Sequence, residues 1–315
     1  MNDTSTPHSR GRIWLQALSG QPGRTVGTLR SVLYADAVLA DAVLADAHAG
    51  HASTGDVSTG HASTGDGQSS DTRPDAMPAR FIAVVPDLQN HFPRARAGEV
   101  GLEEGWALAR VVRDTIAAGA TSASASGGAR QPIVAIVDVS SQAYGRREEL
   151  MGVHMACAAA ANAYADARLA GHPVLALIVG KAMSGAFLAH GYQANRIIAL
   201  DDPGVLIHAM GQAAAARVTR RTVEQLNELG NRFPPMSYDV KNYAKLGMLD
   251  ALLEGIDPDA PDPAALARVR TALAQALASV RESGNRDLTS RYASPQAQTL
   301  RAASIEVRKR LAQQW

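Results

Sequence analysis

The sequence predicts an α/β fold in which buried strands alternate with helices. Residues 80–86 and 133–139 are continuous apolar runs, the pattern of strands that are buried on both faces of a parallel sheet. Each run is followed by a loop and a helical segment, and the same order recurs after Pro173. Such alternation favours a parallel sheet joined by helical crossovers. A chain of 315 residues is long enough to bury a full core of this kind.

The bulk composition narrows the classes of function. The formal net charge is +1, which indicates neither a nucleic-acid-binding surface nor a strongly acidic partner. Cys157 is the single cysteine, so we expect neither an internal disulfide nor a cysteine-built metal site. No run approaches the roughly 20 apolar residues of a membrane span, and the first residues lack the apolar core of a signal peptide. We therefore expect a cytoplasmic protein with no membrane partner.

Apolar periodicity and breakers predict the elements along the chain. We expect disorder over 1–10 and an N-terminal segment that ends near residue 30. Strands are expected at 31–39, 80–86, 133–139, after Pro173 and at 205–210. Helices are expected at 11–18, from Leu102 past Ile116 on the apolar positions Leu102, Trp106, Ala109, Val112 and Ile116, and at 148–169, 217–229, 264–283 and 297–312, with a small-residue linker at 121–131. Residues 257–315 are thus predicted to be a helical extension of a domain over 31–256.

A direct repeat interrupts the first part of the chain. The segment GHASTGD occurs at 50–56 and again at 60–66. Small polar repeats have nothing to bury, so we expect 46–77 to be a disordered low-complexity insertion. A repeat artefact explains its two histidines better than metal binding does, and no carboxylate pair or metal-ligand set elsewhere has suitable spacing.

Residues 174–211 are the leading candidate for the functional site. They are predicted as an apolar strand, a tight turn of small residues at 181–186, a short helix and two further strands. A strand that runs directly into Ser-Gly-Ala and a helix leaves backbone N–H groups without partners. Such donors stabilise a bound anion or the charge that develops on a substrate oxygen.

Three interpretations of this turn remain open. An oxyanion hole needs only backbone donors and small side chains, and the turn has both. A serine hydrolase would use Ser184 as nucleophile and would need His154, His190 or His208 as base, although no histidine follows His208 to complete the usual order. The third interpretation is a helix start that packs closely and binds no ligand.

Two loops are candidates for the same site. The loop at 138–149 contains Gly145, which permits close backbone approach or a positive φ, followed by Arg146 and Arg147, which suit phosphate or carboxylate. If the strands are parallel, this loop and the 181–186 turn leave the sheet at the same edge. The loop at 90–96, NHFPRAR, is either a grip for an anionic cofactor arm or partner, or plain surface.

Longer stretches resemble a known family. VDVSSQAYGRREE, VLALIVGKAMSGAFLAHGYQANRIIALDDPGVLIHAMG and AKLGMLDALLEGIDP resemble the carboxyltransferase branch of the crotonase superfamily. PDLQNHFPRARAGEVGLEEGWALA and QAYGRREELMG are similar to gamma subunits of biotin-independent malonate decarboxylase. The resemblance covers about residues 80–256. It departs from the family pattern at Ser184 and Ser141, where glycines are usual.

The resemblance implies a crotonase-like spiral of repeated ββα units with C-terminal helices, paired with a related beta subunit. The implied reaction decarboxylates a malonyl thioester on an acyl-carrier subunit to an acetyl thioester and CO₂. A CoA-like prosthetic arm on that subunit supplies the thioester, and no metal or biotin is expected. The implied catalytic residues are Gly145, Gly185, Ala186, Ser184 and His208, with Tyr144, Arg146 and Met183 binding substrate.

The resemblance also implies that the chain is only half of an active site. Enolate formation after loss of CO₂ needs donors at the thioester oxygen, and the beta subunit is expected to hold much of the thioester. Two alternatives stay open: a carboxyltransferase half-subunit of a biotin-dependent acyl-CoA carboxylase or decarboxylase, and a non-catalytic scaffold that completes a heteromer.

Overall fold

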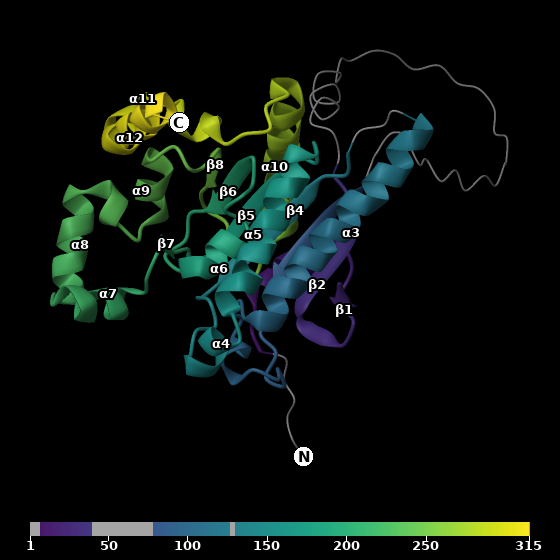
Figure 1. The fold of residues 1–315 in the computed structure, drawn as a ribbon, viewed down its shortest axis with the longest axis horizontal. Coiled ribbons are helices and arrows are strands. Elements are labelled where there is room, and N and C mark those ends of the chain that lie inside the picture. Colours follow the sequence, from purple (N-terminus) through teal and green to yellow (C-terminus); the bar gives the residue numbers. More distant parts are fainter. Residues whose placement is uncertain (1–6, 40–77, 127–129, 315) are drawn as a thin grey trace, which may run out of the picture.

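The computed structural model describes residues 7–39, 78–126 and 130–314, with the backbone alone for 121–126 (Figure 1). The predicted insertion at 46–77 therefore lies outside the described residues. The strands form one sheet in the order β1-β2-β3-β4-β5-β6-β8, with β7 paired to β5 beside this path. Their bounds are β1 Arg24–Val26, β2 Leu29–Val38, β3 Pro78–Val84, β4 Ile133–Val139, β5 Val174–Met183, β6 Arg196–Leu200, β7 Ile207–His208 and β8 Ala251–Leu253.

Helices connect and cover these strands. They are α1 Arg10–Ser19, α3 Leu102–Ser126, α4 Arg146–Leu150, α5 Val153–Leu169, α6 Ser184–Ala189, α7 Gln212–Thr219, α8 Val223–Arg232, α9 Val240–Lys245, α10 Pro263–Ser283, α11 Pro295–Leu300 and α12 Ala302–Gln314. Short 3₁₀ turns lie at η2 Pro93–Ala95, η3 Pro234–Met236 and η4 Thr289–Tyr292. No helix in the part of the chain that the structure describes is long and apolar enough to cross a membrane.

The strand order confirms the predicted α/β class and its repeated ββα units. From β3 onward the neighbouring strands pair in parallel, through β4, β5 and β6 to β8. Each unit has a long strand, then a short pairing, then a helix. Val100, before α3, pairs with Gln142, before α4. In the same way the end of β5, before α6, pairs with β7, before α7. The short pairings collect at the carboxyl ends of the long strands. This edge is where a ligand site is expected in a parallel sheet.

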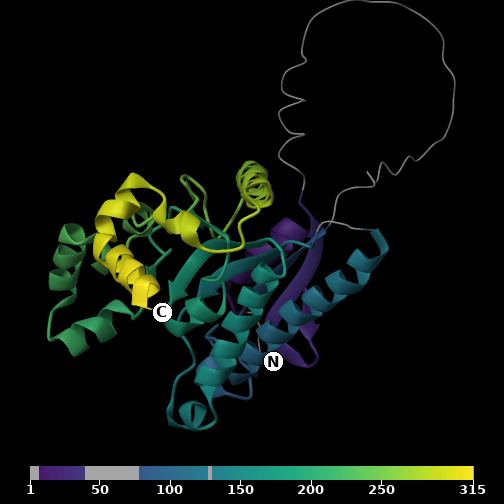
Figure 2. The same cartoon turned by 45° about the horizontal axis from the view of Figure 1, so that its top comes forward.

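The core is closed by helices on both sides of the sheet. β4 and β5 are buried at successive positions, which point to opposite faces, so both faces are covered. α3 and α5 pack along each other over one face of the sheet (Figure 1; Figure 2 gives a second view). On the other face, α1 and α10 contact each other and the strands. The α3–α5 contact is close because Gly105 lies against Ala156, where a Cβ would stand 2.6 Å from the Ala156 carbonyl oxygen. Small residues thus bring these two helices together.

The N-terminal segment is part of the core. Trp14 and Leu15 of α1 are fully buried, and the Trp14 indole donates to the Pro258 carbonyl at 2.9 Å. The prediction of disorder over 1–10 is wrong for Ser9 and Arg10. Ser9 caps α1, and the Arg10 guanidinium pairs with Asp202 and Asp259, 192 and 249 residues away. Residues 1–6 lie outside the described part.

Several predicted helix bounds are corrected. The expected linker at 121–131 begins as helix, because α3 runs to Ser126 through residues without a breaker; Trp106, expected on its apolar face, is 51% exposed. The helix expected at 148–169 breaks at Gly152, and that at 217–229 breaks at Arg220; both residues have left-handed φ values, of 85° and 53°. The helix expected at 297–312 is two helices, α11 and α12. The prediction for 264–283 is confirmed by α10.

Candidate functional site

The loop after β4 and the turn after β5 meet at the same edge of the sheet, as predicted from parallel pairing. Their contact is made by one side chain, that of Gln142. Its Oε1 atom accepts a hydrogen bond from the Gly185 N–H at 2.7 Å and one from the Ser184 hydroxyl at 2.9 Å. The donors of the Ser-Gly turn are therefore present and aligned, but the side-chain carbonyl of Gln142 occupies them.

The turn is built for this contact. Ser184 has a φ of 61°, the left-handed conformation, which costs a residue with a Cβ about 1 kcal/mol or more. Gly185 has no room for a side chain, because a Cβ there would lie 2.3 Å from Gln142 Oε1. The strand β5 continues through Met183 and passes directly into α6, so no linker residue separates the strand from the helix. The backbone holds an unfavourable conformation in order to present two donors to one oxygen.

These donors lie in the wall of a cavity of about 710 Å³, within the range of small-molecule sites. The walls come from α6, β7, η3 and α9, and are mostly apolar. The lining residues are Gln142, Ser184, Gly185, Phe187, Leu188, Tyr192, Ile207, His208, Ala209, Pro234, Pro235, Met236, Ser237, Tyr243 and Leu246. An apolar cavity with a small polar end suits a ligand that is mostly apolar and carries one oxygen-rich group.

His208 is the histidine that lines this cavity. Its ring stacks on Tyr238, with centroids 4.0 Å apart, and its Nδ1 accepts a hydrogen bond from the Met210 N–H at 3.2 Å. Burial lowers the pKa of His208, so the neutral ring is favoured. Since Nδ1 accepts, the proton of the neutral ring belongs on Nε2. His208 is therefore a neutral N–H donor at the cavity.

The geometry does not supply the base that a serine hydrolase needs. The Ser184 hydroxyl donates to an amide oxygen, which does not remove protons. His190 is fully buried, with Nδ1 at 3.0 Å from the Tyr164 hydroxyl and Nε2 at 2.9 Å from the Ile136 carbonyl, and desolvation lowers its pKa to about 4. His154 is exposed on α5. His190 is thus a packing residue, and the serine-hydrolase interpretation loses its support.

Five other predicted site residues do not line the cavity. Gly145 has extended backbone, with a φ of −176°, so the positive φ considered above is not used; a Cβ there would meet the Glu148 carboxylate at 2.5 Å. Tyr144 and Arg146 are exposed next to it. Met183 and Ala186 are buried within the turn. The structure thus brings Ser184, Gly185 and His208 together and leaves these five around them.

Large apolar side chains are exposed on several elements, and two of them, Leu188 and Met236, also line the cavity. They lie on α4 and the residues that flank it, on α5 and α6, after β7 and around η3, and they are Tyr144, Leu150, Met151, Met155, Leu188, Met210, Phe233 and Met236, with exposures from 39% to 80%. Single exposed apolar residues are normal, but clusters of this kind mark surfaces that another molecule covers. We call this group the apolar rim.

The loop at 90–96 has a structural role that its sequence does not reveal. Asn90 is buried and donates to the Glu104 carboxylate at 2.6 Å, which also accepts from Ser31. Burial raises the pKa of Glu104. Phe92 is buried under the Arg147 guanidinium, 5.1 Å from its ring centre. The loop therefore connects α3, through Glu104, with α4, through Arg147.

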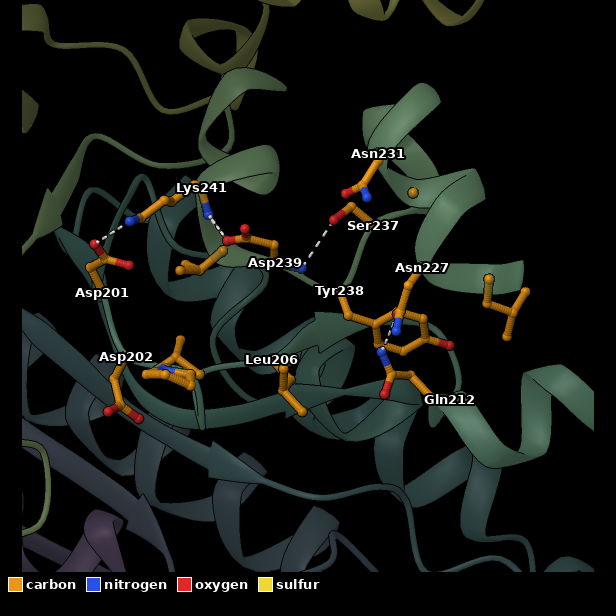
Figure 3. A pocket seen from close by; sticks show the side chains of 15 residues that line it. Asp201, Asp202, Leu206, Gln212, Asn227, Asn231, Ser237, Tyr238, Asp239 and Lys241 are labelled. Carbon is orange, nitrogen blue, oxygen red and sulfur yellow. Dashed lines mark hydrogen bonds and ion pairs between the residues drawn. The ribbon is translucent and has the colours of Figure 1, made fainter. Parts of the chain in front are cut away.

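A second cavity, of about 550 Å³, is lined by Tyr238, by the 201–206 segment that precedes β7, and by residues of α7, α8 and α9. Figure 3 shows several of its polar groups paired with one another. Lys241 contacts Asp201 at 3.0 Å, and the Gln212 amide donates to Asn227 at 3.0 Å. These groups of its wall thus satisfy one another.

Sequence reasoning missed Gln142. The residue stands inside a segment that carries the family resemblance, but nothing in its periodicity or composition distinguishes it from a solvated loop glutamine. The available signal was topological: a polar side chain that follows a buried parallel strand faces the loop of the neighbouring strand.

Together, the parallel sheet and the apolar cavity with a polar donor cluster at its strand ends define an α/β protein with a small-molecule site at the carboxyl edge of the sheet. The sequence profile described as malonate decarboxylase gamma subunit matches residues 95–315. The chain belongs to the malonate decarboxylase gamma subunit family.

Individual relatives agree with this assignment. In the solved structure of a Pseudomonas malonate decarboxylase hetero-tetramer in complex with coenzyme A, the matched chain is 47% identical, with a TM-score of 0.79, over 98% of this chain and 100% of that one. The matched chain of the Pseudomonas MdcD–MdcE hetero-dimer is 46% identical, with a TM-score of 0.76 and the same coverage. Malonyl-S-ACP:biotin-protein carboxyltransferase of Malonomonas rubra is 36% identical over 171 residues; the match spans 54% of this chain and 58% of that protein.

Proposed function

We propose that this chain, paired with a related beta subunit, decarboxylates a malonyl thioester carried by an acyl-carrier subunit. The C–C bond to the carboxylate breaks, CO₂ leaves, the electron pair moves onto the thioester carbonyl oxygen as an enolate, and a proton then reaches carbon to give the acetyl thioester. The observation that carries the proposal is the Gln142–Ser184–Gly185 cluster at the polar end of a mostly apolar cavity.

In this proposal Gln142 is the group that meets the substrate. Because its Oε1 accepts from two fixed donors, its amide nitrogen is the end left for a ligand oxygen. Ser184 and Gly185 act as positioning residues that hold the amide, and the neutral Nε2–H of His208 is a second donor. Donors arranged in advance in a water-poor site each lower such a barrier by roughly 3 kcal/mol.

The remaining predicted residues have supporting roles in the proposal. Ala186 and Met183 pack the turn, and Gly145 places the 138–149 loop beside it. Tyr144, which belongs to the apolar rim, and Arg146, which is exposed two residues later, meet the beta subunit or the CoA-like arm of the acyl-carrier subunit. The apolar rim is the surface that we assign to the beta subunit, in line with the hetero-dimer and hetero-tetramer in which its relatives were solved.

The test is release of ¹⁴CO₂ from labelled malonyl thioester by this chain alone and by the complex co-expressed with its beta and acyl-carrier subunits. We expect turnover by the complex and none above background by the chain alone. Full activity of the isolated chain would contradict the shared site. Gly185→Val in the complex separates the scaffold alternative, which predicts assembly and unchanged activity.

A second candidate is carboxyl transfer to a biotin protein, because the Malonomonas rubra relative bears that name. The same complex, supplied with a biotinylated acceptor protein, distinguishes the two. Label that moves to the acceptor instead of leaving as CO₂ selects the transferase. Label that leaves at the same rate with and without acceptor selects the decarboxylase.

A further inference from the structure

A third cavity lies at the opposite edge of the sheet from the candidate site. It measures about 270 Å³ and is lined by Arg130, which precedes β4, by His172, which precedes β5, and by Arg168 and Arg286 near the ends of α5 and α10. β5 is ten residues long, which separates this cavity from the Ser-Gly turn by about 30 Å. It therefore shares no residue with the proposed active site.

Three of the arginines that line this cavity lack an ion-pair partner among the described residues. In the described ranges, none of Arg130, Arg168 and Arg286 forms an ion pair, whereas Arg10, Arg80 and Arg196 elsewhere do so. Arg168 exposes 9% of its surface, and desolvation lowers its pKa despite the exposed Asp287 nearby. A buried cation without a counter-ion is unfavourable, and an anion in the cavity removes the penalty.

Two buried nitrogen atoms in the wall have no partner among the described residues: Arg168 Nε and His172 Nε2. The other nitrogens of Arg168 are used, one on the Arg286 carbonyl and one on the Gln193 side chain at 3.5 Å. His172 Nδ1 lies 3.0 Å from the Gln131 carbonyl, which only accepts, so Nδ1 carries the proton and Nε2 of the neutral ring is an acceptor. Of the two atoms, only Arg168 Nε is therefore a donor. A third such atom, Arg12 Nε, borders none of the three cavities described above.

The arginines also anchor local structure, but these hydrogen bonds use only some of their N–H donors. Arg130 donates to the Gly119 carbonyl at 2.6 Å and Arg286 to the Leu169 carbonyl at 2.9 Å, where α5 ends. Each guanidinium carries five N–H donors, so one bond of this kind leaves most of them for a ligand. The self-paired cavity in Figure 3 shows the contrast, since its charged and amide groups pair across the wall.

We propose that this arginine pocket binds a small oxyanion of the phosphate type. Guanidinium groups match the oxygens of phosphate in pairs, which makes them the preferred partners of such anions. The volume lies just below the range of drug-sized sites, so the cavity holds one phosphate group, and the rest of any larger molecule that carries it would lie outside. The bound anion neutralises the cluster and joins the end of α5 to the loop after α10.

The test is isothermal titration of inorganic phosphate into the co-purified complex, at constant ionic strength set with sodium chloride. We expect one phosphate per chain, and affinity at least tenfold weaker in Arg130→Gln and in Arg168→Gln. Arg130→Gln is included because Arg168 is buried and its loss can disturb folding; circular dichroism checks both variants. The matched control is Arg110→Gln, an exposed arginine on α3 with its own ion pair to Asp114.

Adenosine 5′-phosphate distinguishes the two sources of the anion. Affinity equal to or weaker than that of inorganic phosphate supports the free ion, whereas tighter affinity that Arg130→Gln abolishes supports a phosphate group on a larger molecule. The proposal is overturned if the wild-type complex takes up no phosphate, or if Arg110→Gln weakens binding as much as Arg130→Gln. Neither result bears on CO₂ release, which tests the proposed function separately.

Discussion

At the scale of single residues, the candidate site depends on one strained backbone position, Ser184. Ser184 adopts a left-handed φ of 61° where most residues with a Cβ are unfavourable, and its hydroxyl and the next N–H meet the same oxygen of Gln142. Strain of this type persists where the surrounding structure imposes it, which is common at functional sites. Replacing the usual glycine by Ser184 therefore adds a donor at the expense of backbone strain.

Gly185→Ala tests this arrangement. Its Cβ would lie 2.3 Å from Gln142 Oε1, so the Gln142 side chain must leave the turn, while the chain still folds because a flexible side chain can move. We expect CO₂ release by the complex to fall at least tenfold, with a thermal unfolding midpoint within a few degrees of wild type. Gly211→Ala is the control, because a Cβ at Gly211 meets no atom within 4 Å. Equal activities of the two variants would show that the Gln142 contact is not needed.

At the scale of elements, the strands were predictable and several helix ends were not. The apolar runs at 80–86 and 133–139 identify β3 and β4 because strands buried on both faces carry no polar alternation. The breaks at Gly152 and Arg220 were missed although both have local signals: Gly152 adopts a left-handed φ before α5, and Thr222 and Gln225 form a capping box at the start of α8. The 121–126 stretch became helix for the converse reason, since serine and alanine permit a helix that is already under way.

The start of α10 shows a local signal that can be tested. Asp262 precedes Pro263, and its carboxylate accepts from the Ala265 N–H at 2.7 Å, so it caps the helix. We expect Asp262→Ala to lower the free energy of unfolding by about 1 kcal/mol in urea titrations. Asp262→Ser keeps a capping oxygen and is expected to stay within a few tenths of wild type. A Ser variant as unstable as the Ala variant would contradict the capping role.

At the scale of the whole molecule, distant segments meet in ways that sequence order conceals. Arg10 joins the start of α1 to Asp202 and Asp259, and Trp14 reaches Pro258, so the N-terminal helix and the start of the C-terminal helices share one core. The candidate site likewise brings Gln142 together with Ser184 and Gly185, which lie 42 and 43 residues further along the chain. Composition predicted a buried sheet and the family resemblance indicated the reaction, but neither indicates which side chain bridges the loops.

Buried histidines make the stability of the whole molecule sensitive to acid. Desolvation lowers the pKa of His190 to about 4, and it also lowers the pKa values of His172 and His208. Below the ordinary value of 6.5 the unfolded chain binds protons that the folded chain does not, so stability is lost as pH falls from about 6.5 toward 4.

Each such group contributes a slope of about 1.4 kcal/mol per pH unit within its window. Urea unfolding should therefore show a lower free energy of unfolding at pH 5 than at pH 7 in wild type. In His190→Asn we expect this loss of free energy per pH unit to be smaller by about 1.4 kcal/mol. Equal slopes in the two proteins would contradict the assignment of a neutral, buried His190.

The central claim is that Gln142 presents its amide nitrogen to the malonyl group. Gln142→Glu tests it most directly, because the carboxylate keeps an oxygen for Ser184 and Gly185 and replaces the N–H donors by a second, charged oxygen. In the co-purified complex we expect single-turnover release of ¹⁴CO₂ to slow at least a hundredfold, with assembly unchanged. Gln275→Glu, an exposed glutamine on α10, should match wild type. A Gln142→Glu complex that releases CO₂ at the wild-type rate would contradict the account.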